Sequence, residues 1–171
     1  RRGFNLLMVN LIERHFAQNA PANAYGAAPF RTPGDFGTPN EAYFAHADWV
    51  LRRARQFGMV VLLCPSYLGY AGGGEGFWQE ILANGVDKMR GYGRYLGARY
   101  RGFDNIIWLQ AGDFTPPRAQ LDLVEAVARE IRRAAPEQLQ SAHWGCEDSS
   151  TDVPIGSWLD LSATYTWLPS Y

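Results

Sequence analysis

Met59-Val-Val-Leu-Leu-Cys64 is the stretch of the chain that decides the fold. The run is apolar throughout and does not alternate with polar residues, so it predicts a strand buried on both faces, as in a parallel sheet. Pro65 ends the run. On its other side, Thr38-Pro39-Asn40-Glu41 begins a helical pattern that Gly58 closes. A helix followed at once by a doubly buried strand is typical of an α/β protein.

The same alternation continues outward in both directions. Three further apolar runs predict strands, at Asn5–Asn10, Asn105–Gln110 and Leu139–Trp144. A more polar stretch, Asp160–Trp167, predicts a fifth strand. Helices are predicted over Phe77–Tyr100 and Pro117–Ala135. Glycines at 85, 91, 93 and 97 each disfavour the first of these helices by about 1 kcal/mol relative to Ala, so we expect close packing or a break there.

Strands alternating with helices predict a parallel sheet, and the fold class we predict is a partial (β/α)₈ TIM barrel. A complete barrel needs eight strand–helix units and about 250 residues, so the 171 residues predict a single domain, 1–171, that is an internal fragment of a barrel. A complete doubly wound open sheet is the alternative. The nucleotide-binding signatures that such sheets often carry, GxGxxG and GxxxxGK[ST], are absent from the sequence.

Composition restricts the class of partner. Sixteen Lys and Arg against seventeen Asp and Glu give a net charge of -1, so the sequence predicts neither a nucleic acid nor a membrane as partner. Neither the two cysteines, Cys64 and Cys146, nor the three histidines have metal-ligand spacing, and we predict no metal and no cofactor. A disulfide between the cysteines is not favoured. A neutral ligand is expected.

Polar and aromatic residues follow each predicted strand, where the active sites of parallel barrels lie. They are Asn10 and Glu13, Ser66 and Tyr67, Gln110 and Asp113, His143, Trp144 and Glu147, and then Tyr165, Thr166 and Trp167. Aromatic faces with short polar groups suit sugars. Glycoside cleavage needs two carboxyls, and Asp113 is the best candidate for the acid. On the residues alone, Asp113 is interpreted equally well as a helix N-cap. The residues alone favour a solvated loop acid for Glu13 and a core residue for His143.

Five segments together resemble the apiosidase-like glycoside hydrolases, which are (β/α)₈ barrels that cleave linkages in plant cell-wall polysaccharides, notably pectic side chains. The segments are Gly3–Asn5, Asn23–Gly26 with Pro29-Phe30, Pro39–Phe44, Tyr95–Tyr100 and Asn105–Asp113. The sequence departs from the family at Ala111, where a glycine is usual, and at Tyr165–Trp167, where a more polar stretch is expected.

The resemblance implies that Asp113 is the general acid/base and that Glu13, Tyr67 and His143 surround an oligosaccharide or polysaccharide substrate. Trp144 and Tyr165 are further predicted substrate contacts from their place after strands. The resemblance also implies a catalytic glutamate after the seventh barrel strand, outside this chain, so we expect the isolated chain to be inactive. The full-length protein is expected to be a metal-independent, retaining hydrolase, and the family suggests export. A barrel that binds carbohydrate without cleaving it, and a metal-dependent hydrolase, are the alternatives.

Overall fold

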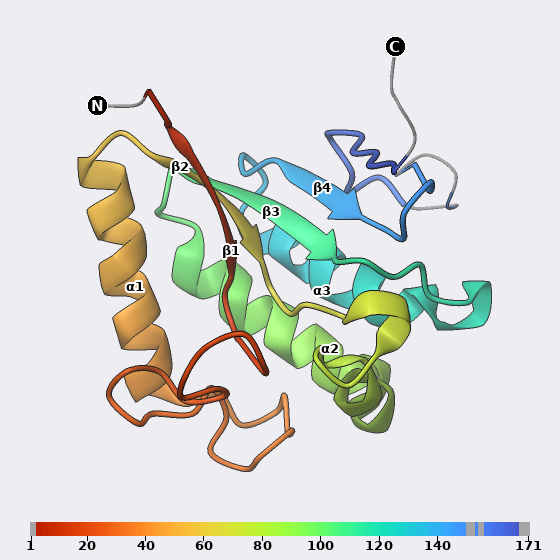
Figure 1. Ribbon diagram of the computed structural model, residues 1–171, viewed down its shortest axis with the longest axis horizontal. Helices are drawn as coiled ribbons and strands as arrows, with labels where there is room; N and C mark the ends of the chain where they lie inside the picture. Colours follow the sequence, from red (N-terminus) through yellow and green to blue (C-terminus); the bar gives the residue numbers. More distant parts are fainter. Residues whose placement is uncertain (1–2, 150–152, 154–155, 168–171) are drawn as a thin grey trace.

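A single parallel sheet forms the centre of the computed structural model, which describes residues 3–149, 153 and 156–167. Its strands are β1 (Leu6–Asn10), β2 (Val60–Cys64), β3 (Ile106–Ala111) and β4 (Gln140–His143). They lie in the order β1-β2-β3-β4, every neighbouring pair parallel (Figure 1). The four apolar strands predicted from the sequence are therefore confirmed, each with bounds that differ by a residue at most at either end.

Three helices connect these strands, namely α1 (Glu41–Gln56), α2 (Trp78–Tyr100) and α3 (Leu121–Ala134). Short 3₁₀ turns precede α2 and α3, at Tyr70–Gly72 and Arg118–Gln120. Strand order follows chain order without reversal, whereas a doubly wound sheet reverses its order at a switch point. The topology is that of a (β/α)₈ barrel over part of its circumference, so the doubly wound alternative is wrong.

The first helix begins and ends where the sequence predicts. The Asn40 side chain accepts a hydrogen bond from the Ala42 N–H, and Gly58, just beyond the helix, has the left-handed φ of 67° that favours glycine. Tyr43, Phe44, Leu51 and Ala54 are the buried residues of α1. The helix thus packs one apolar stripe on the sheet.

The glycines of α2 account for both a break and a close approach. Gly85 is non-helical, with φ 70° and ψ 173°. Further along, a Cβ at Gly93 would lie 2.7 Å from the Val127 carbonyl oxygen of α3, and one at Gly97 would lie 2.8 Å from the Ala134 Cβ. The bare backbone at these two positions lets α2 and α3 pack closely against each other.

Two sequence predictions are corrected. The chain after Pro117 starts with the 3₁₀ turn, and α3 itself begins at Leu121. The predicted fifth strand over Asp160–Trp167 is wrong, because within the described part of the chain this segment forms only isolated bridges, Leu161 with Ser141 and Thr164 with Ser149. The backbone N–H groups of Asp160 and Leu161 both donate to the Gln140 carbonyl, which leaves no regular ladder to propagate.

The core lies between the sheet and its helices, and it includes hydrogen-bonded amides. The Gln110 side chain donates to Gln140 Oε1 at 2.9 Å, and Gln140 Nε2 donates to the Ala128 carbonyl at 3.0 Å. Gln138 likewise accepts from the Trp108 indole at 2.7 Å. These bonds fix β3 and β4 relative to α3 and to each other. Within the described residues, no helix is both long and apolar enough to cross a membrane.

Candidate active site

The carboxyl ends of four parallel strands share one edge of the sheet, and Asp113 lies at this edge after β3. The backbone turns sharply there, with φ values of 69° at Ala111, 120° at Gly112 and 52° at Asp113. Consecutive left-handed residues are costly and tend to occur at functional sites. The 3₁₀ turn that follows has Pro117 at its cap and no side-chain capping bond, so the interpretation of Asp113 as a helix cap is excluded.

The Asp113 carboxylate points to side chains from the neighbouring strand ends. Its Oδ2 accepts a hydrogen bond of 2.8 Å from the Tyr67 hydroxyl, which follows β2. Its Oδ1 lies 3.7 Å from His143 Nε2, at the end of β4. The Tyr165 hydroxyl also interacts with it. The structure therefore brings together four residues that the sequence singled out: Asp113, Tyr67, His143 and Tyr165.

Both tyrosines are kept in the protonated, donating form. Desolvation, with the negative charge and hydrogen bonding of Asp113 adding to it, raises the pKa of Tyr67 well above its ordinary value and that of Tyr165 to about 12. A phenol that holds its proton can donate to a carboxylate but cannot act as a base near neutral pH. The Tyr165 ring also meets the His143 ring edge-on, with centroids 4.9 Å apart.

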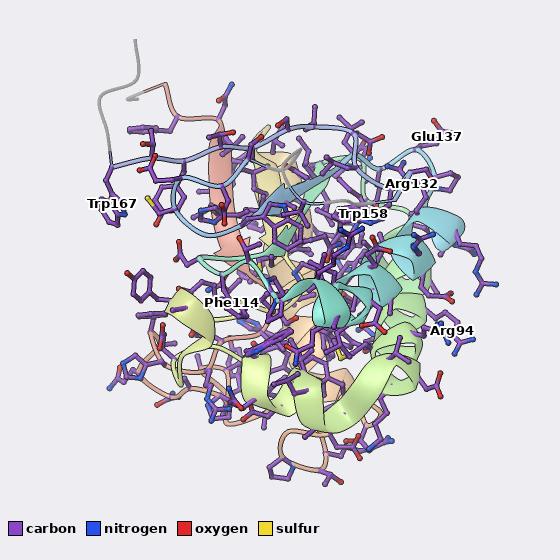
Figure 2. All side chains as sticks on the ribbon, turned by 90° about the vertical axis from the view of Figure 1, so that its right-hand side faces the viewer. Arg94, Phe114, Arg132, Glu137, Trp158 and Trp167 are labelled. Atoms are coloured by element: carbon purple, nitrogen blue, oxygen red, sulfur yellow. The ribbon has the colours of Figure 1, made fainter. Side chains whose placement is uncertain are left out.

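Gly112 is required for this arrangement. A Cβ at this position would lie 2.5 Å from Tyr67 Cδ2, so only glycine lets the Tyr67 ring reach Asp113. On the other side of Asp113, the partly buried Phe114, labelled in Figure 2, packs edge-on against Trp78 with centroids 5.2 Å apart and anchors the turn against the hydrophobic core. The acid is thus held from both neighbours in sequence.

Glu13 has different partners. Its Oε1 accepts from the backbone N–H groups of Arg14, His15 and Phe16, at 2.7, 2.9 and 3.1 Å, and its Oε2 accepts from Asn10 Nδ2 at 3.1 Å. Burial raises the pKa of Glu13, but these four hydrogen bonds outweigh burial and leave it lowered. Glu13 is therefore an ionised cap of the loop after β1.

Trp144 lies in the hydrophobic core with 1% of its surface exposed, and its indole N–H has no hydrogen-bond partner among the residues that the structure describes. The structure does not place its ring at the open edge. The sequence patterns did not single out Phe16 and indicated no role for Glu147 or Trp167, although all three lie near the Asp113 cluster. An aromatic shortly after a strand, close to a carboxylate, is the signal that could have identified Phe16 and Trp167.

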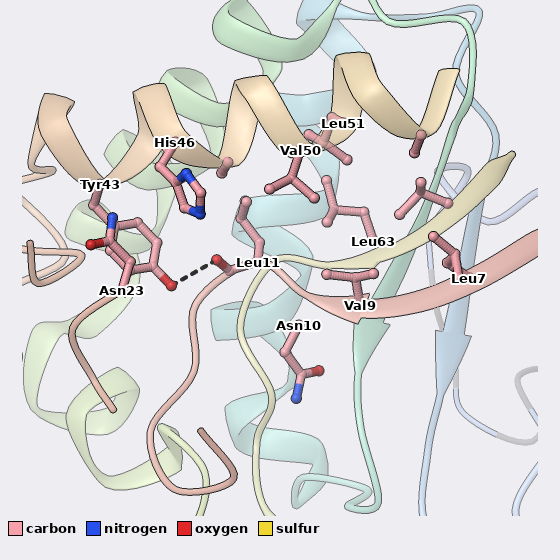
Figure 3. Close-up of a pocket in the computed structure, with 13 residues that line it drawn as sticks. Leu7, Val9, Asn10, Leu11, Asn23, Tyr43, His46, Val50, Leu51 and Leu63 are labelled. Atoms are coloured by element: carbon pink, nitrogen blue, oxygen red, sulfur yellow. Dashed lines mark hydrogen bonds between the residues drawn. The ribbon is translucent and has the colours of Figure 1, made fainter. Parts of the chain in front are cut away.

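Among the described residues, no three His, Cys, Asp or Glu side chains gather in a way that could hold a metal ion. Cys64 and Cys146 are both free thiols. A pocket between α1, β1 and β2 is lined almost wholly by aliphatic side chains, with Tyr43, His46 and Asn23 at one end (Figure 3). Neither Asp113 nor any residue that contacts it lines this pocket, so the apolar pocket and the candidate site are separate.

Comparisons with known proteins agree with this geometry. The model of the family described as apiosidase-like, catalytic domain, matches residues 1–167. A solved structure described as a glycoside hydrolase is 24% identical, with a TM-score of 0.74 over 95% of this chain and 35% of its own. A glycoside hydrolase family 5 structure from Bacteroides vulgatus is 21% identical, with a TM-score of 0.75 over 94% of this chain and 33% of its own.

Thermotoga maritima Cel5A in complex with cellobiose has a TM-score of 0.59 at 14% identity, over 92% of this chain and 47% of its own. The chain spans about a third of the length of the two structures above. At these identities the likeness establishes the fold, a barrel matched over part of its length. A search of curated proteins finds no significant match.

Proposed function

Because the chain belongs to the apiosidase-like catalytic domain family, we propose that it forms part of a glycoside hydrolase active site in which Asp113 is the general acid/base. The observation that carries the proposal is the 2.8 Å hydrogen bond from Tyr67 to Asp113 Oδ2 at the carboxyl edge of the sheet. A carboxyl that only capped a helix would not be held there by side chains from the neighbouring strands.

The hydrogen bond supports separate tasks for the two oxygens of Asp113 in the proposed mechanism. Tyr67 donates to Oδ2, which leaves Oδ1, the oxygen that faces His143, as the proposed carrier of the transferable proton. Oδ1–H protonates the glycosidic oxygen as the bond to the anomeric carbon breaks, and the resulting carboxylate later takes a proton from water. Tyr67 and Tyr165 stabilise that carboxylate because both keep their own protons.

The second carboxyl of the mechanism is proposed to come from a strand end other than the four described here. Glu13 is engaged by four hydrogen bonds, which leaves it unsuited to attack an anomeric carbon. The proposed reaction is retaining, on pectic side chains of plant cell-wall polysaccharide, with the second carboxylate as nucleophile. The anomeric form of the first product, followed by NMR, tests the stereochemistry.

The test of the proposal is Asp113→Asn in the full-length protein. We expect turnover of a pectic substrate to fall by about 10²- to 10⁴-fold, with binding of that substrate largely kept. Asp104→Asn is the matched control, since Asp104 lies just before β3, at the opposite end of the strand, and pairs with Arg55. Equal turnover in the two variants would refute the role of Asp113. Wild-type protein that binds the substrate but never cleaves it would indicate a carbohydrate-binding barrel.

A further inference from the structure

Two exposed aromatic side chains lie next to the tyrosines of the Asp113 cluster. Phe16 is 66% exposed and its ring meets that of Tyr67 edge-on, with centroids 6.1 Å apart. Trp167 is 75% exposed and its ring meets that of Tyr165 in the same way at 5.9 Å. Figure 2 shows Trp167 projecting from the periphery of the molecule, whereas Phe114 lies further inside. Large exposed rings beside a polar site are costly to keep in water and suit a ligand with apolar faces.

Glu13 fixes the turn that carries Phe16. Its carboxylate takes three successive backbone N–H groups, the last of which belongs to Phe16 itself. Within the same turn, the Arg14 guanidinium donates to the Gly74 carbonyl at 2.8 Å and pairs with Glu80. An otherwise irregular loop is thereby tied to α2 and to the loop before it, and the exposed ring is held in one place.

Glu147 fixes the segment that carries Trp167 in a similar way. Its Oε1 accepts from the Trp167 backbone N–H at 2.9 Å, and its carboxylate accepts from the Thr166 hydroxyl at 2.7 and 2.6 Å. The Glu147 N–H in turn donates to the Tyr165 carbonyl at 3.0 Å. Glu147 itself adopts a left-handed φ of 70°, a strained conformation for a residue other than glycine.

The two rings lie on opposite sides of Asp113 along the sheet. Phe16 follows β1, Asp113 follows β3, and the segment that carries Trp167 makes its parallel bridge to β4, on the side away from β3. From β1 to β4 the strand ends span three intervals of about 4.8 Å, roughly 14 Å along the sheet, which exceeds the width of a single sugar ring. A ligand that extends from the end of β1 to the end of β4 is therefore longer than one sugar unit and passes Asp113, which follows β3.

We infer that Phe16 and Trp167 are aromatic platforms for sugar units on the two sides of the bond that Asp113 protonates, and that Glu13 and Glu147 are positioning residues that hold these platforms. The inference rests on the proposed function, since it assumes that the ligand is a saccharide. It adds that the site selects an oligosaccharide by its length and binds it by ring stacking at both ends.

The test compares short and long oligosaccharides prepared from pectin by acid hydrolysis, with binding to the full-length protein measured by calorimetry. Phe16→Ala and Trp167→Ala are each expected to weaken binding of the long probe by roughly 3- to 10-fold. Phe57→Ala and Trp49→Ala are matched controls, because these side chains are 69% and 58% exposed but lie away from Asp113. Trp49 is part of α1, and Phe57 directly follows that helix. The controls should bind as the wild type does.

Glu13→Ala tests positioning by a double-mutant cycle with Phe16→Ala. If Glu13 acts by holding the ring, the double variant binds the long probe no more weakly than Phe16→Ala alone, whereas independent effects would add. The inference would be overturned if the wild type bound the long probe no better than the short one and if both platform variants bound the long probe as the wild type does. The role of Asp113 would then still be tested separately, by the Asp113→Asn measurement. Failure of the wild type to bind either probe would refute the inference and the proposed substrate class together.

Discussion

The close approach of α2 and α3 predicts opposite effects for the same substitution two residues apart. Gly91 and Gly93 both lie in α2, but a Cβ at Gly91 has nothing within 4 Å. A Cβ at Gly93 would lie 2.7 Å from the carbonyl oxygen and 2.8 Å from the Cα of Val127. Those atoms belong to the backbone of α3, so they cannot rotate away, and the two helices would have to separate by several tenths of an ångström.

The magnitude follows from two effects. Replacing Gly by Ala within a helix gains about 1 kcal/mol at either position, because the unfolded chain loses conformational freedom. Overpacking against fixed backbone costs about 1–3 kcal/mol and applies only at Gly93. The helix gain cancels in the difference, so Gly93→Ala should be about 1–3 kcal/mol less stable than Gly91→Ala.

Urea unfolding followed by circular dichroism measures the free energy of unfolding of both variants. Thermal unfolding should separate their midpoints by about 2–12 °C, since about 2–4 °C corresponds to each kcal/mol in a domain of this size. Equal stabilities of the two variants would refute the interpretation of Gly93 as a packing contact, and with it the account of how α3 is set against α2.

Three further outcomes are expected. Gly112→Ala should lower turnover strongly in the full-length protein, because the new Cβ would lie 2.5 Å from Tyr67 Cδ2 and would push the Tyr67 ring away from Asp113. An unchanged kcat would contradict that reasoning. Burial raises the pKa of Cys64 from 9.0 to about 12, so the folded state disfavours the thiolate. The free energy of unfolding should therefore fall as pH rises from 9 towards 12. Urea unfolding repeated across that range should show a less steep fall for Cys64→Ala. A thiol reagent at pH 8 should modify Cys146 in the native protein but reach Cys64 only after unfolding, and equal reaction rates would argue against its burial.

The strands and Asp113 were predictable because their signals are local. Continuous apolar runs specify doubly buried strands, and a carboxyl that comes directly after such a run lies at the edge where parallel strands end. The breaks and close contacts of α2 were likewise anticipated from its glycines. The partners of Asp113 depend on contacts between residues far apart in sequence, such as Tyr67 and Tyr165, so their hydrogen bonds to it could not be predicted.

The placement of Trp144 could have been anticipated. Successive residues of a strand point to opposite faces of a sheet, so if His143 faces Asp113, its neighbour faces the core. The prediction of a fifth strand was wrong for a different reason. The Asp160 side chain forms an ion pair with Arg132 and accepts a hydrogen bond of 2.8 Å from the Gln140 N–H. Such a side-chain substitute for strand pairing has no signature in hydrophobic periodicity.

The central claim is that Asp113 protonates the departing oxygen, and its most direct test is how the effect of Asp113→Asn on kcat/KM depends on the leaving group. With a sugar or alkyl alcohol as leaving group, protonation is needed, and we expect a loss of about 10²- to 10⁴-fold. With a dinitrophenolate leaving group, which departs without a proton, the first step should be nearly unaffected. An equal loss for both leaving groups, or no loss for either, would contradict the assignment.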